Sequence, residues 1–71
     1  MVPPERAREL VADGMATVKE AAAFLRVSVA QLYNLMHNGD VPYLKIGRSR
    51  RVPRRALIEL AARNLVGGQD A

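Results

Sequence analysis

The sequence predicts a small, mainly α-helical domain that carries one short β-hairpin. Two helix-capping patterns follow each other closely, beginning at Thr17 and Ser28. After Pro42 the spacing of apolar residues changes from a period of 3.6 to a period of 2, and Pro53 then suits the first position of a last helix. A chain of 71 residues is near the lower limit for a single core, so we expect one compact unit.

Residues 1–15 are expected to form an N-terminal helix. Proline is tolerated in the first helical turn, which allows a helix from Pro3 to Val11, and Asp13-Gly14 would end it. Ala7, Leu10 and Val11 are spaced as i, i+3 and i+4. This spacing gives the helix one apolar face that would lie against the rest of the chain.

The main domain is expected at residues 16–66, and it begins with a short helix. Thr17 and Glu20 form a capping box, in which the side chain of each residue bonds the backbone NH of the other. The helix would run to about Leu25. Because a helix of two turns is unstable alone, its apolar side chains are expected to be buried. They are Ala21, Ala22, Phe24 and Leu25.

A tight turn at Arg26-Val27 leads to a second helix. Ser28 is placed to cap it, and Gln31 occupies the acceptor position of another capping box. The apolar stripe of this helix is Leu32, Leu35 and Met36. Gly39 suits the left-handed position that follows a helix, and Pro42 prevents any continuation.

The hairpin is expected directly after Pro42. Leu44 and Ile46 alternate with more polar neighbours, as in a strand with one apolar face. Turn residues follow at Gly47-Arg48-Ser49, and Arg50-Arg51-Val52 forms the returning strand. The sequence therefore predicts a short hairpin with a basic tip.

A last helix is expected from Pro53 to about Asn64. Its expected buried stripe is Ala56, Leu57, Leu60 and Ala61. Gly67-Gly68 would end the ordered region, and residues 67–71 are expected to be a disordered tail.

Positive charge is concentrated in and just after the hairpin. The net charge is +4 and the pI about 10.4. Between Lys45 and Arg55 there are six basic residues and no acidic one. Such a run of like charges costs self-repulsion that a polyanionic partner would relieve, although a solvated surface turn is the alternative interpretation.

The composition argues against several classes of function. The chain has no cysteine and His37 is its only histidine, so it offers neither a disulfide framework nor a set of zinc ligands. No apolar stretch approaches the roughly 20 residues of a membrane span, and the N-terminus lacks a signal-peptide pattern, so a cytoplasmic location is expected. A lone histidine on an exposed helix is typical of a surface residue, so we expect no enzyme, metal, cofactor or small-molecule effector.

Two short helices joined by a three-residue turn predict a helix-turn-helix, whose second helix protrudes and fits the DNA major groove. On the outer face of that helix, Gln31 and Asn34 can each form two hydrogen bonds to adenine. Val29 or Ala30 can contact a thymine methyl group. Exposed polar residues on a short helix are also typical of a solvated surface, so the helix alone does not decide between the two interpretations.

Phosphate contacts are expected from Ser28, from Tyr33 and from the basic hairpin. A helix N-terminus adds backbone NH donors, and arginine on a turn can reach phosphates or a narrow minor groove. The full set of expected DNA-binding residues is Thr17, Ser28, Val29, Ala30, Gln31, Tyr33, Asn34, His37, Lys45, Arg48, Ser49, Arg50 and Arg51.

The order of these motifs resembles the excisionase-type, MerR-like family of winged helix-turn-helix proteins. The resemblance rests on residues 17–28 (TVKEAAAFLRVS), Leu32-Tyr33, Gly39-Asp40-Val41-Pro42 and Ile46-Gly47-Arg48. It covers residues 16–63. It implies that residues 28–37 are the recognition helix. It also implies that the wing on the DNA backbone and minor groove is formed by Lys45, Arg48, Arg50 and Arg51.

Members of this family include phage and mobile-element excisionases, which bind repeated sites beside an integrase core site and bend the DNA. The resemblance thus implies double-stranded DNA, neighbouring copies and an integrase as partners. The small size of the chain is more typical of an excisionase than of a full MerR regulator, whose coiled coil requires a longer chain. Neighbouring copies would touch through the N-terminal helix and through the wing or last helix. Relatives often carry arginine where this sequence has Val29 and Asn34, so strong guanine reading is not expected. A small transcriptional regulator and the DNA-recognition domain of a phage packaging subunit are the alternatives.

Overall fold

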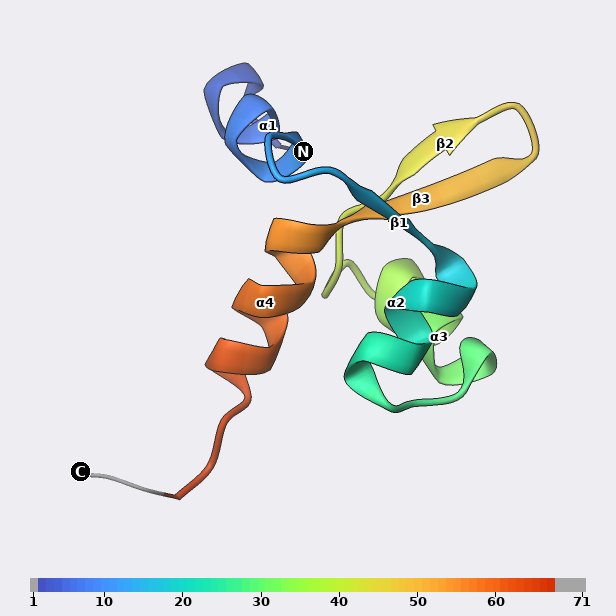
Figure 1. Ribbon diagram of the computed structural model, residues 1–71, viewed down its shortest axis with the longest axis vertical. Helices are drawn as coiled ribbons and strands as arrows, with labels where there is room; N and C mark the ends of the chain where they lie inside the picture. The colour runs from blue at the N-terminus through green and yellow to red at the C-terminus, as the bar shows by residue number, and fades with distance from the viewer. Residues whose placement is uncertain (1, 68–71) are drawn as a thin grey trace.

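The computed structural model describes residues 2–67, which form four helices and three strands (Figure 1). In chain order these are α1 (Pro4–Val11), β1 (Met15–Thr17), α2 (Val18–Leu25), α3 (Val29–His37), β2 (Leu44–Ile46), β3 (Ser49–Pro53) and α4 (Arg54–Arg63). The predicted fold class, mainly α with a β-hairpin wing, is confirmed. Apart from Gly67, the tail expected at residues 67–71 lies outside the described residues.

The three strands form one antiparallel sheet in the order β1-β3-β2. In its register, Ala16 of β1 lies opposite Val52 of β3, and Lys45 of β2 lies opposite Arg50. The sequence predicted β2 and β3 but not β1. A strand of three residues shows no clear period, and its partner β3 lies far along the chain, so no local pattern indicated it.

The helices begin close to the predicted positions, through the predicted caps. The capping box of α2 is complete, because Thr17 Oγ1 accepts from the Glu20 NH at 3.0 Å and Glu20 Oε1 accepts from the Thr17 NH at 2.9 Å. At α3, Ser28 Oγ accepts from the Gln31 NH at 3.0 Å, whereas the return bond from the Gln31 side chain is absent from the described contacts. Pro53 is the N-cap of α4 and the last residue of β3, so α4 begins at Arg54, one residue later than predicted.

The core lies between the sheet and helices α2, α3 and α4. Its buried members are Ala16, Ala21, Ala22, Leu32, Met36, Val41, Val52, Leu57 and Leu60. The prediction was wrong for Phe24, whose side chain is 55% exposed, and for Ala61, which is also exposed. In α2 the stripe that faces the core has the spacing i, i+3, i+4 and i+7, and Phe24 falls beside it. That stripe is Val18, Ala21, Ala22 and Leu25.

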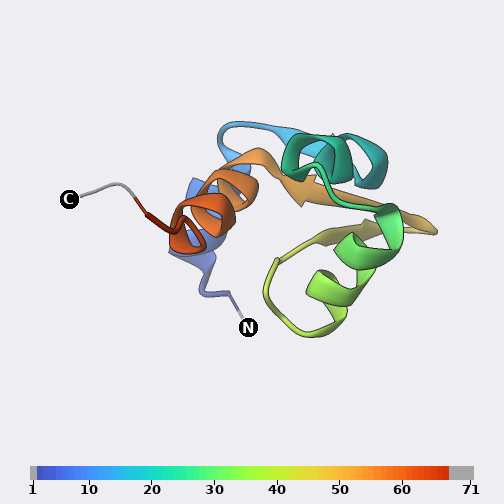
Figure 2. The same ribbon diagram turned by 90° about the horizontal axis from the view of Figure 1, so that it is seen from below.

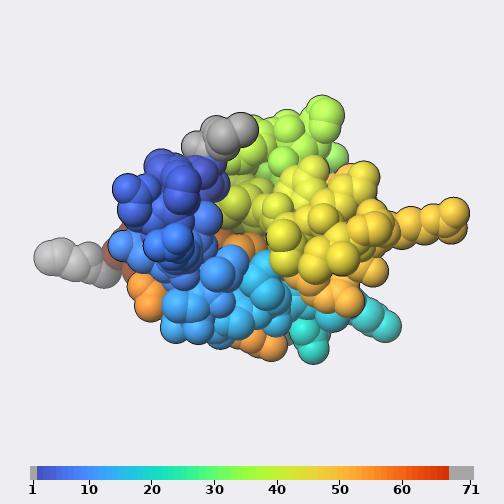
Figure 3. Space-filling model, turned by 90° about the horizontal axis from the view of Figure 1, so that it is seen from above, coloured from blue at the N-terminus to red at the C-terminus, as the bar shows by residue number. Residues whose placement is uncertain are grey.

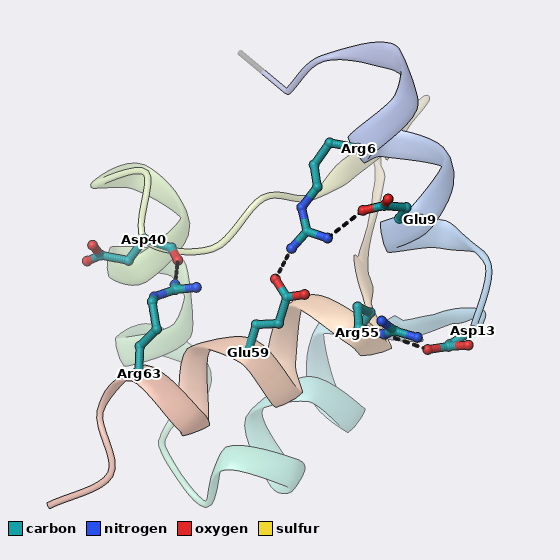
Figure 4. A network of polar contacts seen from close by, with 7 residues as sticks. All are labelled: Arg6, Glu9, Asp13, Asp40, Arg55, Glu59 and Arg63. Carbon is teal, nitrogen blue, oxygen red and sulfur yellow. Dashed lines mark hydrogen bonds and ion pairs between the residues drawn. The ribbon is translucent and has the colours of Figure 1, made fainter.

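Helix α1 packs against α4 and is joined to it by the ion pair between Arg6 and Glu59 (Figure 4). The Arg6 guanidinium lies between Glu9 and Glu59, and Arg55 of α4 donates to Asp13 at 2.8 Å. Leu10 is buried as expected, whereas Val11 is 47% exposed. The N-terminal helix and the last helix were both expected to touch neighbouring copies. Within one chain, α1 and α4 cover part of each other's surface.

The wing, defined here as residues 44–53, projects from the helices, with α3 on the same side of the molecule and α4 on the other (Figures 1 and 2). From above, α1 and the wing form opposite ends of one face (Figure 3). Within residues 2–67 no helix has the length and apolar character needed to cross a membrane, and the longest, α4, has 10 residues.

Candidate nucleic-acid interface

A three-residue turn sets the angle between α2 and α3. Arg26 adopts the left-handed conformation (φ 58°, ψ 43°), and the NH of Val27 donates to the Ala22 carbonyl at 3.0 Å. Residues other than glycine rarely adopt this conformation, because their Cβ approaches the following carbonyl oxygen. The chain thus reverses direction within three residues, and the two helices pack closely enough for Leu32 and Met36 to be buried.

The remaining face of α3 is exposed. It carries the predicted residues Val29, Ala30, Gln31, Tyr33, Asn34 and His37, none of which is buried. The amide groups of Gln31 and Asn34 make no described hydrogen bond, so their donors and acceptors are available to a ligand. Ser28 uses its oxygen to cap the helix and retains its hydroxyl hydrogen as a donor.

The wing divides its polar residues between two faces. Successive residues of a strand point to opposite sides, so Arg50 and its partner Lys45 share the side of the buried Val52. Ser49 and Arg51 lie on the other side. Gly47 takes the left-handed conformation (φ 60°) that the turn between β2 and β3 requires. The exposed Arg48 stands at this turn, which is the predicted basic tip.

Arg50 lies between two tyrosine rings. Its guanidinium carbon is 5.1 Å from the centroid of the Tyr33 ring on α3 and 4.7 Å from that of Tyr43, the residue before β2. Both distances fall within the range of about 6 Å for a cation–π interaction. Arg50 was predicted only as a phosphate contact, and Tyr43 was not predicted as a site residue. An aromatic residue directly before a basic hairpin was the available signal.

Ion pairs neutralise the basic residues that follow the wing. Arg54 Nη2 lies 3.9 Å from Glu20 Oε1, and Arg55 Nε lies 2.8 Å from Asp13 Oδ2. Across residues 2–67 the other four members of the predicted basic segment take part in no ion pair. They are Lys45, Arg48, Arg50 and Arg51. The uncompensated positive charge of this segment is therefore located on the wing.

Thr17 lies at the base of the wing, opposite Arg51 in the sheet. Its backbone NH bonds the carboxylate of Glu20 and lowers the pKa of that group, and the nearby charges of Arg54 and Arg51 lower the pKa further. The Thr17 hydroxyl accepts the Glu20 NH and can still donate its own hydrogen. Thr17 is thus first a structural cap, with one donor left for a ligand.

The part of the chain that the structure describes contains no group of three His, Asp or Glu side chains that could hold a metal ion. His37 stands in the last turn of α3, exposed, beside the amides of the same helix.

Comparison with known proteins agrees with this geometry. Residues 17–65 match the protein family described as "Helix-turn-helix domain". A "Putative DNA-binding protein" of Mycobacterium tuberculosis, present in two strains, is 46% identical over 44 residues, which is 62% of this chain and 56% of that protein. A "Probable excisionase" of Saccharopolyspora erythraea is 40% identical over 65 residues, 92% of this chain and 65% of that protein.

The chain thus spans less than two thirds of the length of these relatives. No solved structure gives a significant match. The family match covers the capped helices, the wing and α4, and so includes both the exposed face of α3 and the basic wing described above. The chain belongs to the excisionase-type family of helix-turn-helix domains.

Proposed function

We propose that the protein is an excisionase, which binds specific sites in double-stranded DNA, bends them and assists an integrase in excision. One observation carries the proposed mode of binding: the exposed polar face of α3 stands beside a wing whose four cations are in no ion pair within residues 2–67. The excision role is supported by the likeness of nearly the whole chain to the Saccharopolyspora protein.

Helix α3 would enter the major groove and read bases. Asn34 and Gln31, with free side-chain amides, would each hydrogen-bond the N6 and N7 edge of an adenine. Val29 and Ala30 would contact thymine methyl groups, and His37 would reach the end of the site. Since no arginine lies on this face, the preferred site would be rich in A·T pairs where α3 contacts it.

The wing and the helix caps would hold the phosphates. Arg48, at the tip, would reach farthest from the core, with Lys45, Ser49 and Arg51 beside it. Ser28 and Thr17 would each donate a hydroxyl hydrogen at a helix N-terminus, where backbone NH groups also favour an anion. These contacts would fix the orientation of α3 without reading sequence.

Several copies would act together on one DNA. A single recognition helix and wing bury about 600 to 1,000 Å² of protein surface, which is modest. Copies placed head to tail on repeated sites would add neighbour contacts, and these would offset the few kcal/mol needed to bend the DNA. We expect cooperative, stepwise binding to DNA that carries two or more sites.

The test is excision in vitro with purified components. The integrase encoded nearest to the gene is incubated with DNA that carries the two junctions of the integrated element, with and without this protein. We expect excision products to depend on the protein, and we expect a single site moved along a fragment to change the gel mobility of the complex, as bent DNA does. The Arg48→Ala variant should lower the yield, whereas Arg55→Ala, whose charge is paired with Asp13, should not.

Two results would contradict the proposal. Full excision without the protein, or excision that is no higher with a saturating concentration of the protein than without it, would remove the recombination role. If the protein then bound promoter DNA and changed transcription, it would be a small MerR-like regulator that uses the same interface.

A further inference from the structure

We infer that Arg50 is a positioning residue, which fixes the wing against the recognition helix by stacking between Tyr33 and Tyr43. The inference rests on the proposed DNA-binding function and adds to it a device that sets the angle between the two DNA-contacting elements. In this role Arg50 acts through the tyrosine rings, whereas Arg48 acts on DNA directly.

The direction of the Arg50 side chain follows from the register of the sheet. Val52, two positions later on β3, is fully buried, so Arg50 points toward the same side as the core. Beyond the edge of the core this side is occupied by α3, from which Tyr33 projects. Arg50 is accordingly half-buried, in contrast to the exposed Arg48. A guanidinium is planar and can stack on aromatic rings with its NH groups still free at the edge.

Little else holds the outer part of the wing. All three residues of β2 are exposed, and Ile46 is 64% exposed, so β2 adds nothing to the buried core. Within residues 2–67 no hydrogen bond or ion pair joins α3 to the wing. The cation–π contact of Arg50 with Tyr33 is the described polar link between these elements, and the contact with Tyr43, directly before β2, holds the guanidinium from a second side.

The link has a consequence for specificity. A wing held at a fixed angle lets its cations meet phosphates while α3 sits in register with the bases. A loose wing would keep its charge and its nonspecific attraction for DNA, but ordering it on a specific site would reduce affinity there. Loss of the stack should therefore weaken specific binding more than nonspecific binding, and should leave the salt dependence unchanged.

Tyr43 offers the cleanest perturbation, because it lies outside α3 and was assigned no contact with DNA. Tyr43→Leu removes one ring and keeps every charge, and Tyr43→Phe is the matched control that keeps the ring. In proton NMR of the free protein, the Arg50 side-chain resonances should be shifted upfield by the rings in the parent and in Tyr43→Phe. In Tyr43→Leu they should move toward random-coil values, and wing amides should exchange faster with solvent.

On DNA, Tyr43→Leu should bind the preferred site about two- to fivefold more weakly, the fold-change expected from one exposed cation–π pair, with nonspecific affinity and salt slope unchanged. Tyr43→Phe should match the parent. Unshifted Arg50 resonances in the parent, or unchanged specific affinity in Tyr43→Leu, would overturn the inference and leave Arg50 as an independent phosphate contact. If the parent bound no duplex, the proposed function would fail, and the Arg50 resonances alone would then decide whether the stack exists.

Discussion

Arg48→Ala and Arg55→Ala each remove one positive charge, but the structure predicts different effects on DNA binding. Arg48 stands exposed at the wing tip with no ion pair in the described residues, whereas Arg55 is 2.8 Å from Asp13. Each phosphate neutralised by a protein cation contributes about 0.9 to the slope of log affinity against log salt. Arg48→Ala should therefore lower the slope by about 0.9, so that the parent loses about 3.5-fold more affinity than the variant between roughly 50 and 200 mM salt. Arg55→Ala should leave the slope close to that of the parent.

The assay is a titration of one fluorescent duplex with each protein at four or more salt concentrations. Thermal unfolding of both variants provides the control for folding, since both residues are exposed. Equal slopes for Arg48→Ala and the parent would show that the wing tip is a solvated turn. An equal decrease for both variants would show that net charge, and not its location on the wing, governs binding; either result would contradict a phosphate contact specific to Arg48.

The remaining predictions concern base reading and stability. Asn34→Ala should cost about 1 to 3 kcal/mol at the preferred site while nonspecific affinity stays unchanged, and selection of bound sequences checks whether the preference is altered. Leu32→Ala, at a fully buried position, should lower the free energy of unfolding by about 2 to 5 kcal/mol in denaturant titrations. Arg26→Gly should raise it by about 0.5 to 1 kcal/mol, because glycine relieves the left-handed backbone; equal or lower stability would contradict this. The side-chain hydrogen bond from Arg6 lowers the pKa of Glu59, so this pair stabilises the fold at pH values above the ordinary glutamate pKa of about 4.3. The stabilisation is lost as the pH falls through the lowered pKa of Glu59. Glu59→Gln should therefore weaken the dependence of the unfolding free energy on acid pH.

The features that could be predicted from the sequence are local ones. The capping box at Thr17 and Glu20 spans three positions, and the serine cap of α3 does the same, so both helices start where expected. The turn at Gly47 and the change of period after Pro42 likewise depend on neighbouring residues. The family resemblance rests on these same local motifs, which is why the fold class was predicted correctly.

The features that could not be predicted depend on distant partners. β1 is a strand because Ala16 packs opposite Val52, and nothing in its three residues signals this. Phe24 is exposed because α2 faces its neighbours with Val18, Ala21, Ala22 and Leu25, and Phe24 falls beside this stripe. The stack of Arg50 on two tyrosines joins three segments, and a basic run in the sequence does not distinguish a stacked arginine from a phosphate contact.

We propose that the exposed face of α3 and the wing together form the DNA-binding surface. Backbone NMR of the protein titrated with its preferred duplex tests it most directly, because every described element reports separately. We expect large shift changes in residues 28–37 and 44–51, and small changes in α1 and in the outer face of α4. Changes concentrated on α1 and α4, with α3 and the wing unaffected, would contradict it.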